Sequence, residues 1–336
     1  MLLVHAFNSS CQHLCLVAKE HETEKRMRQF ACAMARPLGA SEGKELVVIV
    51  YCGQNIDNGY HRAREALQRS FLHDLFRHSS FNYSGPVGFN TGDNGTITCD
   101  TALALKEHGY PYLSHATLSY RGTVCAELKT IVFQPDYHFI QTLGFKDLVL
   151  KLSDIGTPLP QRQKKVIWRG APTGRIVNGC DSLVRARICL LARNITWLDF
   201  GIVKHLPGCP GMEISNRIPE LDWVQFRGIL DIDGNANAWG LFWRLASGSV
   251  VFRVESPWTN SYIDRLKPWV HFIPIFENLT NLEEVTRIVT TDDSSELQLL
   301  SDIAMNAITF VKPITYSSEV ERVANNLTNL FGSPFR

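Results

Sequence analysis

The sequence lacks an uninterrupted apolar run of the roughly 18 residues that a membrane-spanning helix needs, so no membrane span is expected. It also lacks an excess of one charge, since 34 Lys and Arg residues stand against 33 Asp and Glu residues. This balance gives no general attraction to nucleic acid or to an anionic membrane. An anionic ligand must therefore be bound locally, by a few placed cations.

Three common motifs are missing as well. No Cys-x-x-Cys pair occurs, which excludes a zinc ribbon or a thioredoxin motif. No P-loop ending in Gly-Lys-Ser/Thr occurs, and no Gly-x-Gly-x-x-Gly follows the first expected strand, so neither a P-loop nucleotide hydrolase nor a Rossmann-type oxidoreductase is supported. The nine cysteines are expected to be mostly buried thiols, with one or two disulfides if the chain is secreted.

The start of the chain does not resemble a signal peptide, because its apolar stretch, 1–7, is short and soon becomes polar. The sequence is therefore either that of a cytoplasmic protein or one whose true N-terminus is missing. The number of Asn-x-Ser/Thr sequons favours the lumen of the endoplasmic reticulum or Golgi, since chance predicts roughly two or three. The six sequons begin at Asn8, Asn82, Asn94, Asn194, Asn278 and Asn326.

Apolar runs alternate with helix-like patterns along the chain, which predicts an α/β fold with parallel sheets. Expected strands lie at 46–51, 87–90, 166–168, 195–198, 228–232, 249–254 and 271–275. Expected helices lie at 20–36, 61–78, 181–193, 239–246, 280–290, 294–310 and 317–331.

The best candidate for a linker is 157–163, where two prolines interrupt the pattern. We therefore expect two α/β domains that face each other across a cleft. The first covers 1–158, the second covers 159–315, and 316–336 adds a C-terminal helix.

A glycine-containing loop follows the expected strand at 166–168 and precedes a helix. Ligands of open α/β sheets bind at the carboxyl ends of strands, where glycines let backbone amides approach a phosphate. Guanidinium groups match phosphate oxygens in pairs, so the two arginines of this loop suit a diphosphate. The alternative is a surface turn with solvated arginines. The candidate donor-binding residues of this loop are Arg169, Gly170, Thr173, Gly174 and Arg175.

A second candidate element runs from Asp231 through a helix start to the strand at 249–254. Asp231 and Asp233 form an Asp-x-Asp pair, which many glycosyltransferases use to hold a divalent cation. Only Asp233 lies at the end of the expected strand, which favours a structural or sugar-facing Asp233 over a metal site, and we expect no metal. The candidate donor-binding residues of this element are Asp233, Gly234, Asn235, Arg244, Gly248 and Ser249.

A third element, 265–275, reads RLKPWVHFIPI, and its prolines fix extended backbone around aromatic residues that are expected to pack. Together with the Trp168-Arg169-Gly170 loop and the Asp233-Gly234-Asn235 element, it resembles the C-terminal half of glycosyltransferase family 90, which includes the CAP10-like proteins and protein O-glucosyltransferases. Order and spacing both agree over about 160–310, and the resemblance is faint before that.

This resemblance implies a GT-B-like fold of two Rossmann-type domains, with the donor held mainly by the second. It also implies transfer of glucose or xylose from a UDP-sugar to a protein or glycan hydroxyl, with inversion and without a required metal or cofactor. The chain departs from some relatives at 239–244, where they carry an arginine-rich helix start. Arg169, Arg175 and Arg244 are therefore the candidates for the cation that meets the diphosphate.

Inversion in one displacement needs a general base, which the family takes from the N-terminal domain. Asp93 follows an expected strand at the corresponding place, with Asp57 as the rival and Asp100 as a third candidate. The alternative for Asp93 is an ordinary turn residue. A degenerate relative that binds glycans without catalysis is the alternative for the whole chain.

Overall fold

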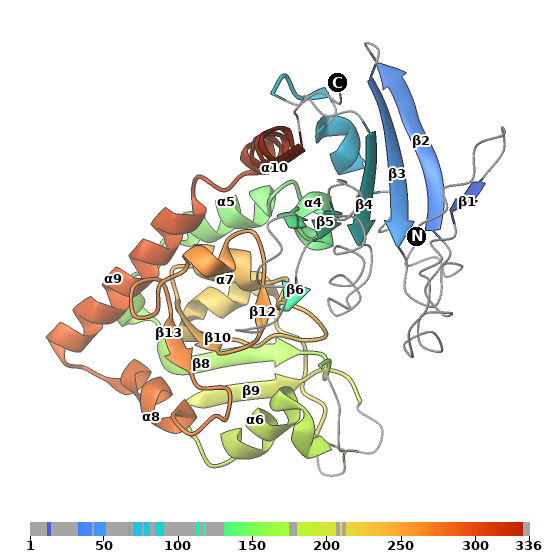
Figure 1. Cartoon of the computed structure of the whole chain (residues 1–336). Coiled ribbons are helices and arrows are strands. Elements are labelled where there is room, and N and C mark those ends of the chain that lie inside the picture. Colours follow the sequence, from blue (N-terminus) through green and yellow to red (C-terminus); the bar gives the residue numbers. More distant parts are fainter. Residues whose placement is uncertain are drawn as a thin grey trace. The chain divides into compact units, whose positions relative to one another are not determined.

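The protein was analysed as a computed structural model, which describes residues 12–14, 33–41, 44–51, 67, 70–75, 77–80, 85–90, 112–114, 117–118, 131–174, 180–205, 209 and 213–331. The chain divides into two compact units. Unit 1 comprises residues 1–141 together with 316–336, and unit 2 comprises residues 142–315. Both units are described below separately (Figure 1).

Unit 2 contains a five-stranded, fully parallel sheet in the order β13-β11-β10-β8-β9. The strands are β8 (Gln163–Gly170), β9 (Leu198–Ile202), β10 (Phe226–Asp231), β11 (Val250–Val254) and β13 (Ile273–Ile275). Every residue of β10 and β11 is buried, which explains their nearly continuous apolar sequence. Because all five strands run in one direction, their carboxyl ends share one edge, the carboxyl edge, and their starts share the amino edge.

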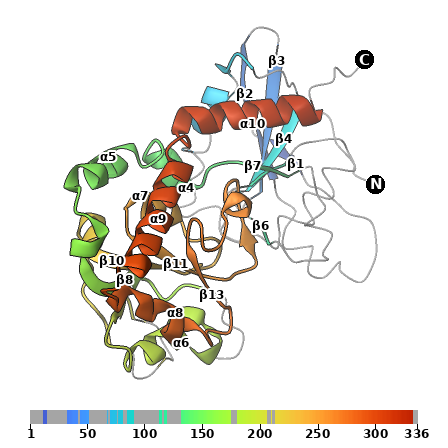
Figure 2. The same ribbon diagram turned by 90° about the vertical axis from the view of Figure 1, so that its left-hand side faces the viewer.

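Helices of unit 2 pack against this sheet: α6 contacts β9, α7 contacts β10 and β11, α8 contacts β13, and α9 contacts β11 (Figures 1 and 2). Their bounds, together with the preceding α5, are α5 (Lys146–Ile155), α6 (Val184–Ala192), α7 (Leu241–Ala246), α8 (Leu282–Thr286) and α9 (Ser294–Val311). The 3-10 helices are η1 (Leu159–Gln161), η2 (Cys180–Ser182), η3 (Glu220–Gln225), η4 (Ile263–Arg265) and η5 (Arg287–Thr290). Asp293 begins α9 as its N-cap and accepts hydrogen bonds from the amides of Ser295 and Glu296.

Unit 1 contains a six-stranded sheet in the order β1-β2-β3-β4-β5-β7. The strands are β1 (Gln12–Leu14), β2 (Ala33–Ser41), β3 (Lys44–Tyr51), β4 (Gly85–Asn90), β5 (Tyr112–Ser114) and β7 (Ile131–Phe133). From β3 to β7 the neighbours are parallel, whereas β1, β2 and β3 pair antiparallel. The short helix α4 (Tyr137–Gln141) follows β7.

The last helix of the chain, α10 (Tyr316–Phe331), belongs to unit 1, and Figure 2 shows it beside that unit's strands. Its apolar face, which includes Val323 and Leu327, joins a core with Phe71, Leu72 and Leu113. Arg322 anchors it by donating a 2.6 Å hydrogen bond to the carbonyl of Phe133 at the end of β7. The chain therefore leaves unit 1, forms unit 2 and returns.

Most expected elements match the structure, so the predicted α/β fold with parallel sheets is confirmed. Two details differ: Ala33–Ser41 is a strand where 20–36 was expected to be helical, and β9 begins at Leu198, where the expected strand ended. The division between the units falls after Gln141, upstream of the expected linker at 157–163, which instead contains η1 within unit 2. The GT-B-like arrangement and the three-part division at 158 and 315 stay predictions.

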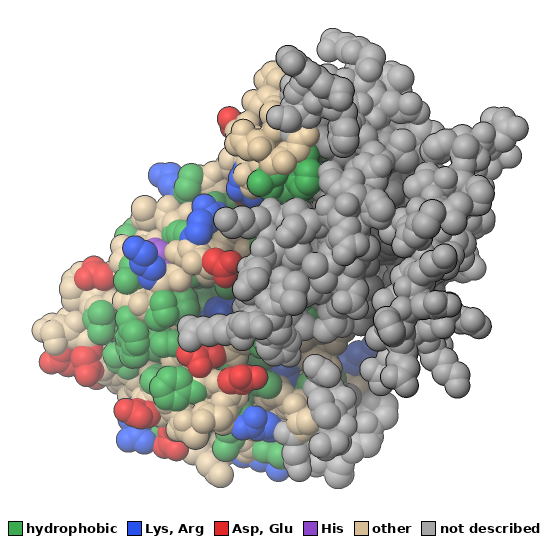
Figure 3. All heavy atoms as spheres, in the orientation of Figure 1, with side chains coloured by type: hydrophobic (Ala, Val, Ile, Leu, Met, Phe, Trp, Pro, Cys, Tyr) green, Lys and Arg blue, Asp and Glu red, His purple; other side chains and the backbone are tan. Residues whose placement is uncertain are grey.

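The described surface carries charges of both signs, interspersed among apolar side chains on the face that Figure 3 shows. This agrees with the balanced charge of the sequence. Within the described ranges, no helix is long and apolar enough to cross a membrane.

Candidate functional site

Two loops meet at the carboxyl edge of the unit 2 sheet. The first, called the β8 loop, covers 171–174, and the second, called the β10 loop, covers 232–240. The Gly174 amide donates a 3.1 Å hydrogen bond to the side-chain carbonyl of Asn235, which joins the two loops directly. The structure thus brings together Gly170, Thr173, Gly174, Asp233, Gly234 and Asn235, all of them candidate donor-binding residues.

Arg185 of α6 holds both loops from below. Its Nη1 donates to the Ala171 carbonyl at 2.7 Å and to Thr173 Oγ1 at 2.6 Å, and its Nη2 donates to the Ile232 carbonyl at 2.8 Å. The guanidinium also lies 5.2 Å from the ring centre of Trp168, within the range of a cation–π contact. One side chain therefore fixes the backbone of both loops.

The close approach of the loops depends on glycine at position 234. A Cβ there would lie 2.8 Å from Thr173 Oγ1 and 3.2 Å from Arg185 Nη2. Gly174 needs its own freedom for a different reason, because its φ of +145° is a conformation that residues with a side chain rarely adopt.

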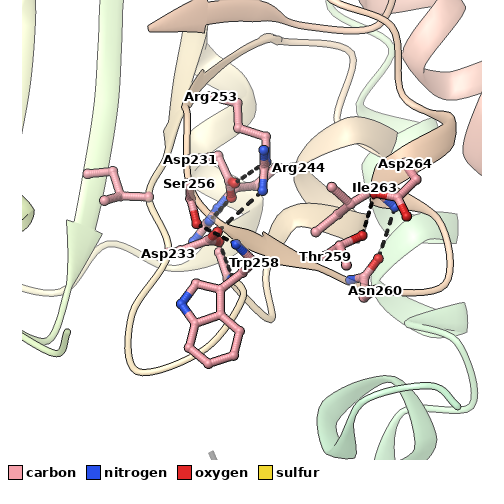
Figure 4. Close-up of polar contacts among 12 residues, drawn as sticks. Asp231, Asp233, Arg244, Arg253, Ser256, Trp258, Thr259, Asn260, Ile263 and Asp264 are labelled. Atoms are coloured by element: carbon pink, nitrogen blue, oxygen red, sulfur yellow. Dashed lines mark hydrogen bonds and ion pairs between the residues drawn. The ribbon is translucent and has the colours of Figure 1, made fainter. Parts of the chain in front are cut away.

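A network of four charged side chains lies beside these loops, and Figure 4 shows the four pointing toward one another. Asp231 is fully buried and pairs with Arg244 at 2.5 Å and with Arg253 at 3.5 Å. Arg253 pairs in turn with Asp233 at 3.3 Å. Burial raises the pKa of the Asp231 carboxyl, and the two guanidinium groups oppose that shift.

Asp233 has a second role, because its Oδ1 accepts a 2.6 Å hydrogen bond from the Ala238 amide and closes the β10 loop ahead of α7. Asp231 and Asp233 are thus both engaged by arginines and by backbone. A divalent cation at this pair would have to displace those arginines. No group of three or more possible metal-ligating side chains occurs among the described residues.

Two of the predicted diphosphate cations have carboxylate partners within the protein. Arg169 donates to Asp199 Oδ1 at 2.6 Å and to the carbonyls of Trp168 and Asp199 at 2.9 Å each. Arg244 pairs with Asp231 and packs against the rings of Trp223 and Trp243, at 5.5 and 5.4 Å. Contact of either arginine with a donor stays a prediction, and Arg175 lies outside the described residues.

Gly248 and Ser249 were expected at the donor site, and the structure places them elsewhere. Ser249 Oγ donates to the carbonyl of Phe226, the first residue of β10, and accepts from Arg162 just before β8, both at 2.8 Å. They precede β11 and so lie at the amino edge, at the opposite ends of the strands from Gly170 and Asp231. The expectation was wrong because a residue that begins a parallel strand cannot share an edge with residues that end one.

The third sequence element, 265–275, contributes β13 and a tight turn. Phe272, Ile273 and Ile275 are buried, as expected of aromatic and apolar residues that pack. Trp269 differs, since it is about half exposed and adopts a φ of +62°. Its amide donates a 2.7 Å hydrogen bond to the Phe272 carbonyl, which closes the turn.

Sequence reasoning missed four residues of this edge: Arg185, Asp199, Asn237 and Arg253. Arg253 pairs with Asp231 because β10 and β11 are in a register that sets these two residues side by side. Asn237 is 3% exposed, and neither polar atom of its amide has a hydrogen-bond partner. Such unsatisfied groups cost roughly 1–3 kcal/mol each, so the β10 loop stores polar capacity that the protein does not use internally.

The general-base candidates Asp93, Asp57 and Asp100 all lie outside the described residues. Their order of preference, with Asp93 first, stays a prediction.

Comparison with known proteins decides the family. The family model described as Glycosyl transferase family 90 matches residues 121–330, more than half of the chain. This chain belongs to glycosyl transferase family 90. The predicted resemblance is thereby confirmed, and it extends further toward the N-terminus than 160–310.

Curated relatives of this family 90 member include protein O-glucosyltransferase 2 from Danio rerio, 28% identical over 148 residues, 43% of this chain and 29% of the relative. Protein O-glucosyltransferase 1 from Mus musculus is 29% identical over 83 residues, 25% of this chain and 21% of the relative. Less than a third of either relative is therefore spanned by the match.

Solved structures with a similar fold include a glycosyltransferase from Rickettsia africae, with a TM-score of 0.41 and 9% identity over 86% of this chain and 98% of the other. Another is Anabaena Alr3699/HepE in complex with UDP, with a TM-score of 0.40 and 8% identity over 80% of this chain and 82% of the other.

Proposed function

We propose that this family 90 member transfers a sugar from a UDP-sugar donor to a hydroxyl of a protein or glycan. The observation that carries the proposal is the junction of the β8 and β10 loops at the carboxyl edge, closed by the Gly174–Asn235 hydrogen bond and by Arg185. This is the edge at which open α/β sheets bind nucleotides. Family membership supports the choice of a nucleotide-sugar over other nucleotides.

Glucose and xylose are the proposed sugars, and the names of the protein O-glucosyltransferase relatives favour glucose. We propose inversion in a single displacement, with Asp93 as the base that accepts the proton of the acceptor hydroxyl. A GT-B-like arrangement would supply that base from the unit opposite the donor.

The proposed compartment is the lumen of the endoplasmic reticulum or Golgi, with the cytoplasm as the alternative. A disulfide joins Cys180, at the start of η2, to Cys209, and disulfides persist mainly in oxidising compartments. Two of the sequon asparagines, Asn194 and Asn278, are exposed, as acceptors of a glycan must be.

The proposal is tested by release of UDP from UDP-glucose and UDP-xylose in the absence of acceptor, with GDP-mannose as the matched control donor. We expect slow hydrolysis of at least one UDP-sugar and none of GDP-mannose. Excess EDTA should leave the rate unchanged, because arginines already engage Asp231 and Asp233.

A chain that binds none of these nucleotides but retains a glycan would instead be a degenerate glycan-binding relative. Loss of hydrolysis in EDTA with recovery on adding Mn²⁺ would contradict the metal-independent mechanism.

A further inference from the structure

Arg185 differs from its neighbours at the carboxyl edge in having no carboxylate partner. Arg169 pairs with Asp199, Arg244 with Asp231, and Arg253 with both Asp231 and Asp233. The three hydrogen-bond acceptors of Arg185 are neutral oxygens: two backbone carbonyls and the Thr173 hydroxyl. Four guanidinium groups in this described part of the edge thus face three carboxylates, and the unbalanced charge is that of Arg185.

This charge persists at neutral pH although its surroundings oppose it. Burial lowers the pKa of Arg185 to about 10, the nearby Arg244 adds to that shift, and Asp233 and Asp231 act against it. The group is therefore protonated at pH 7, in a place where a bare positive charge is unfavourable. An anion bound at the edge would relieve this condition.

The guanidinium also has hydrogen-bonding capacity to spare. An arginine carries five N–H groups, and the three hydrogen bonds of Arg185 leave the N–H on Nε and one on Nη2 without an acceptor. The carbonyls that it does hold belong to the two loops that meet at the edge, so its charge and the loop backbone are placed together.

We infer that Arg185 supplies the positive charge that binds the diphosphate of the donor at the carboxyl edge of unit 2, while it holds the two loops that surround this anion. The inference rests on the proposed function for the identity of the nucleotide. It assigns the charge to Arg185 because the charges of Arg169 and Arg244 are already balanced by carboxylates.

Arg162 provides a matched control. It too is held by neutral oxygens only, donating to the carbonyls of Thr157 and Ser247 and to Ser249 Oγ, at 3.0, 3.3 and 2.8 Å. It lies at the amino edge, where parallel sheets do not bind nucleotides. A difference between the two arginines therefore reports position at the site and not the loss of a structural clamp.

The test measures the affinities of the full chain for UDP, uridine and inorganic pyrophosphate by titration calorimetry, in the wild type and in Arg185→Gln, Arg185→Lys and Arg162→Gln. For Arg185→Gln we expect the dissociation constants of UDP and pyrophosphate to rise at least about tenfold and that of uridine to change less than twofold, because uridine carries no charge. Arg185→Lys should recover part of the loss, and Arg162→Gln should match the wild type.

Equal weakening of UDP and uridine in Arg185→Gln would overturn the inference, because a clamp without an electrostatic role acts on both. Unchanged affinity for UDP would overturn it as well. If Arg185→Gln fails to fold, the folded Arg185→Lys variant decides: a selective loss for the two anions supports the inference and a uniform loss contradicts it. A wild type that binds pyrophosphate through Arg185 but not UDP would contradict the proposed function and leave this inference standing.

Discussion

Asp231 is the residue whose environment most clearly separates structure from catalysis at this site. Its carboxylate is fully buried between Arg244 and Arg253, so it is positioned to hold the edge together and cannot reach a ligand directly. Removing one partner of such a buried pair leaves an uncompensated charge, which costs about 3–5 kcal/mol.

We therefore expect Asp231→Asn to lower the free energy of unfolding by about 3–5 kcal/mol, as measured by urea denaturation followed through tryptophan fluorescence. The matched control is Asp292→Asn, which breaks the exposed Lys164–Asp292 pair and should have a much smaller effect. Equal losses in the two variants would show that the Asp231 network does not stabilise the protein.

At this same scale, the sequence predicted the residues that lie in loops and missed those that act through pairing. Gly170, Thr173, Gly174 and the Asp233–Asn235 stretch were identifiable because each follows an apolar strand. Arg185 and Arg253 were not, because their roles depend on which carbonyl or carboxylate the fold sets against them. The alternation of a strand gives the face of a residue, whereas the partner depends on the register of the neighbouring strand.

The β8 and β10 loops act as one element, because a hydrogen bond and a shared arginine join them. Gly234→Ala tests this coupling, since the added Cβ would lie 2.8 Å from Thr173 Oγ1 and force the loops apart. We expect weaker UDP binding by titration calorimetry with a folded protein.

The double variant Gly234→Ala/Thr173→Ala is the companion to that measurement. It removes the hydroxyl that the Cβ would strike, and it should recover part of the UDP affinity. If it binds UDP no better than the single variant, the loops are not coupled through this contact.

Element types were predicted more securely in unit 2 than at the start of the chain. The expected helix at 20–36 rested on one apolar stripe, yet residues 33–36 belong to a strand that pairs with β3 along its length. Pairing with a neighbouring strand overrides local helix propensity, and a short pattern cannot reveal the neighbour. β9 shows the same limit, since buried Ile195 precedes the strand and does not belong to it.

For the whole molecule, periodicity predicted two α/β bodies but not how the chain is shared between them. The helix at 316–331 was expected as a separate C-terminal element, and it instead completes the core of unit 1 with Phe71, Leu72 and Leu113. Contacts between residues more than 200 positions apart leave no periodic trace in the sequence. The family, in contrast, was readable from three short motifs because their order and spacing are specific.

The central claim is that the carboxyl edge of unit 2 is the nucleotide-sugar site, and hydrogen–deuterium exchange of the full chain with and without saturating UDP tests it most directly. We expect UDP to slow exchange in peptides that cover 168–174 and 232–240, and to leave peptides at the amino edge, 157–162 and 246–249, unchanged. Slower exchange at the amino edge alone, or UDP binding without any change in the two loops, would contradict the account.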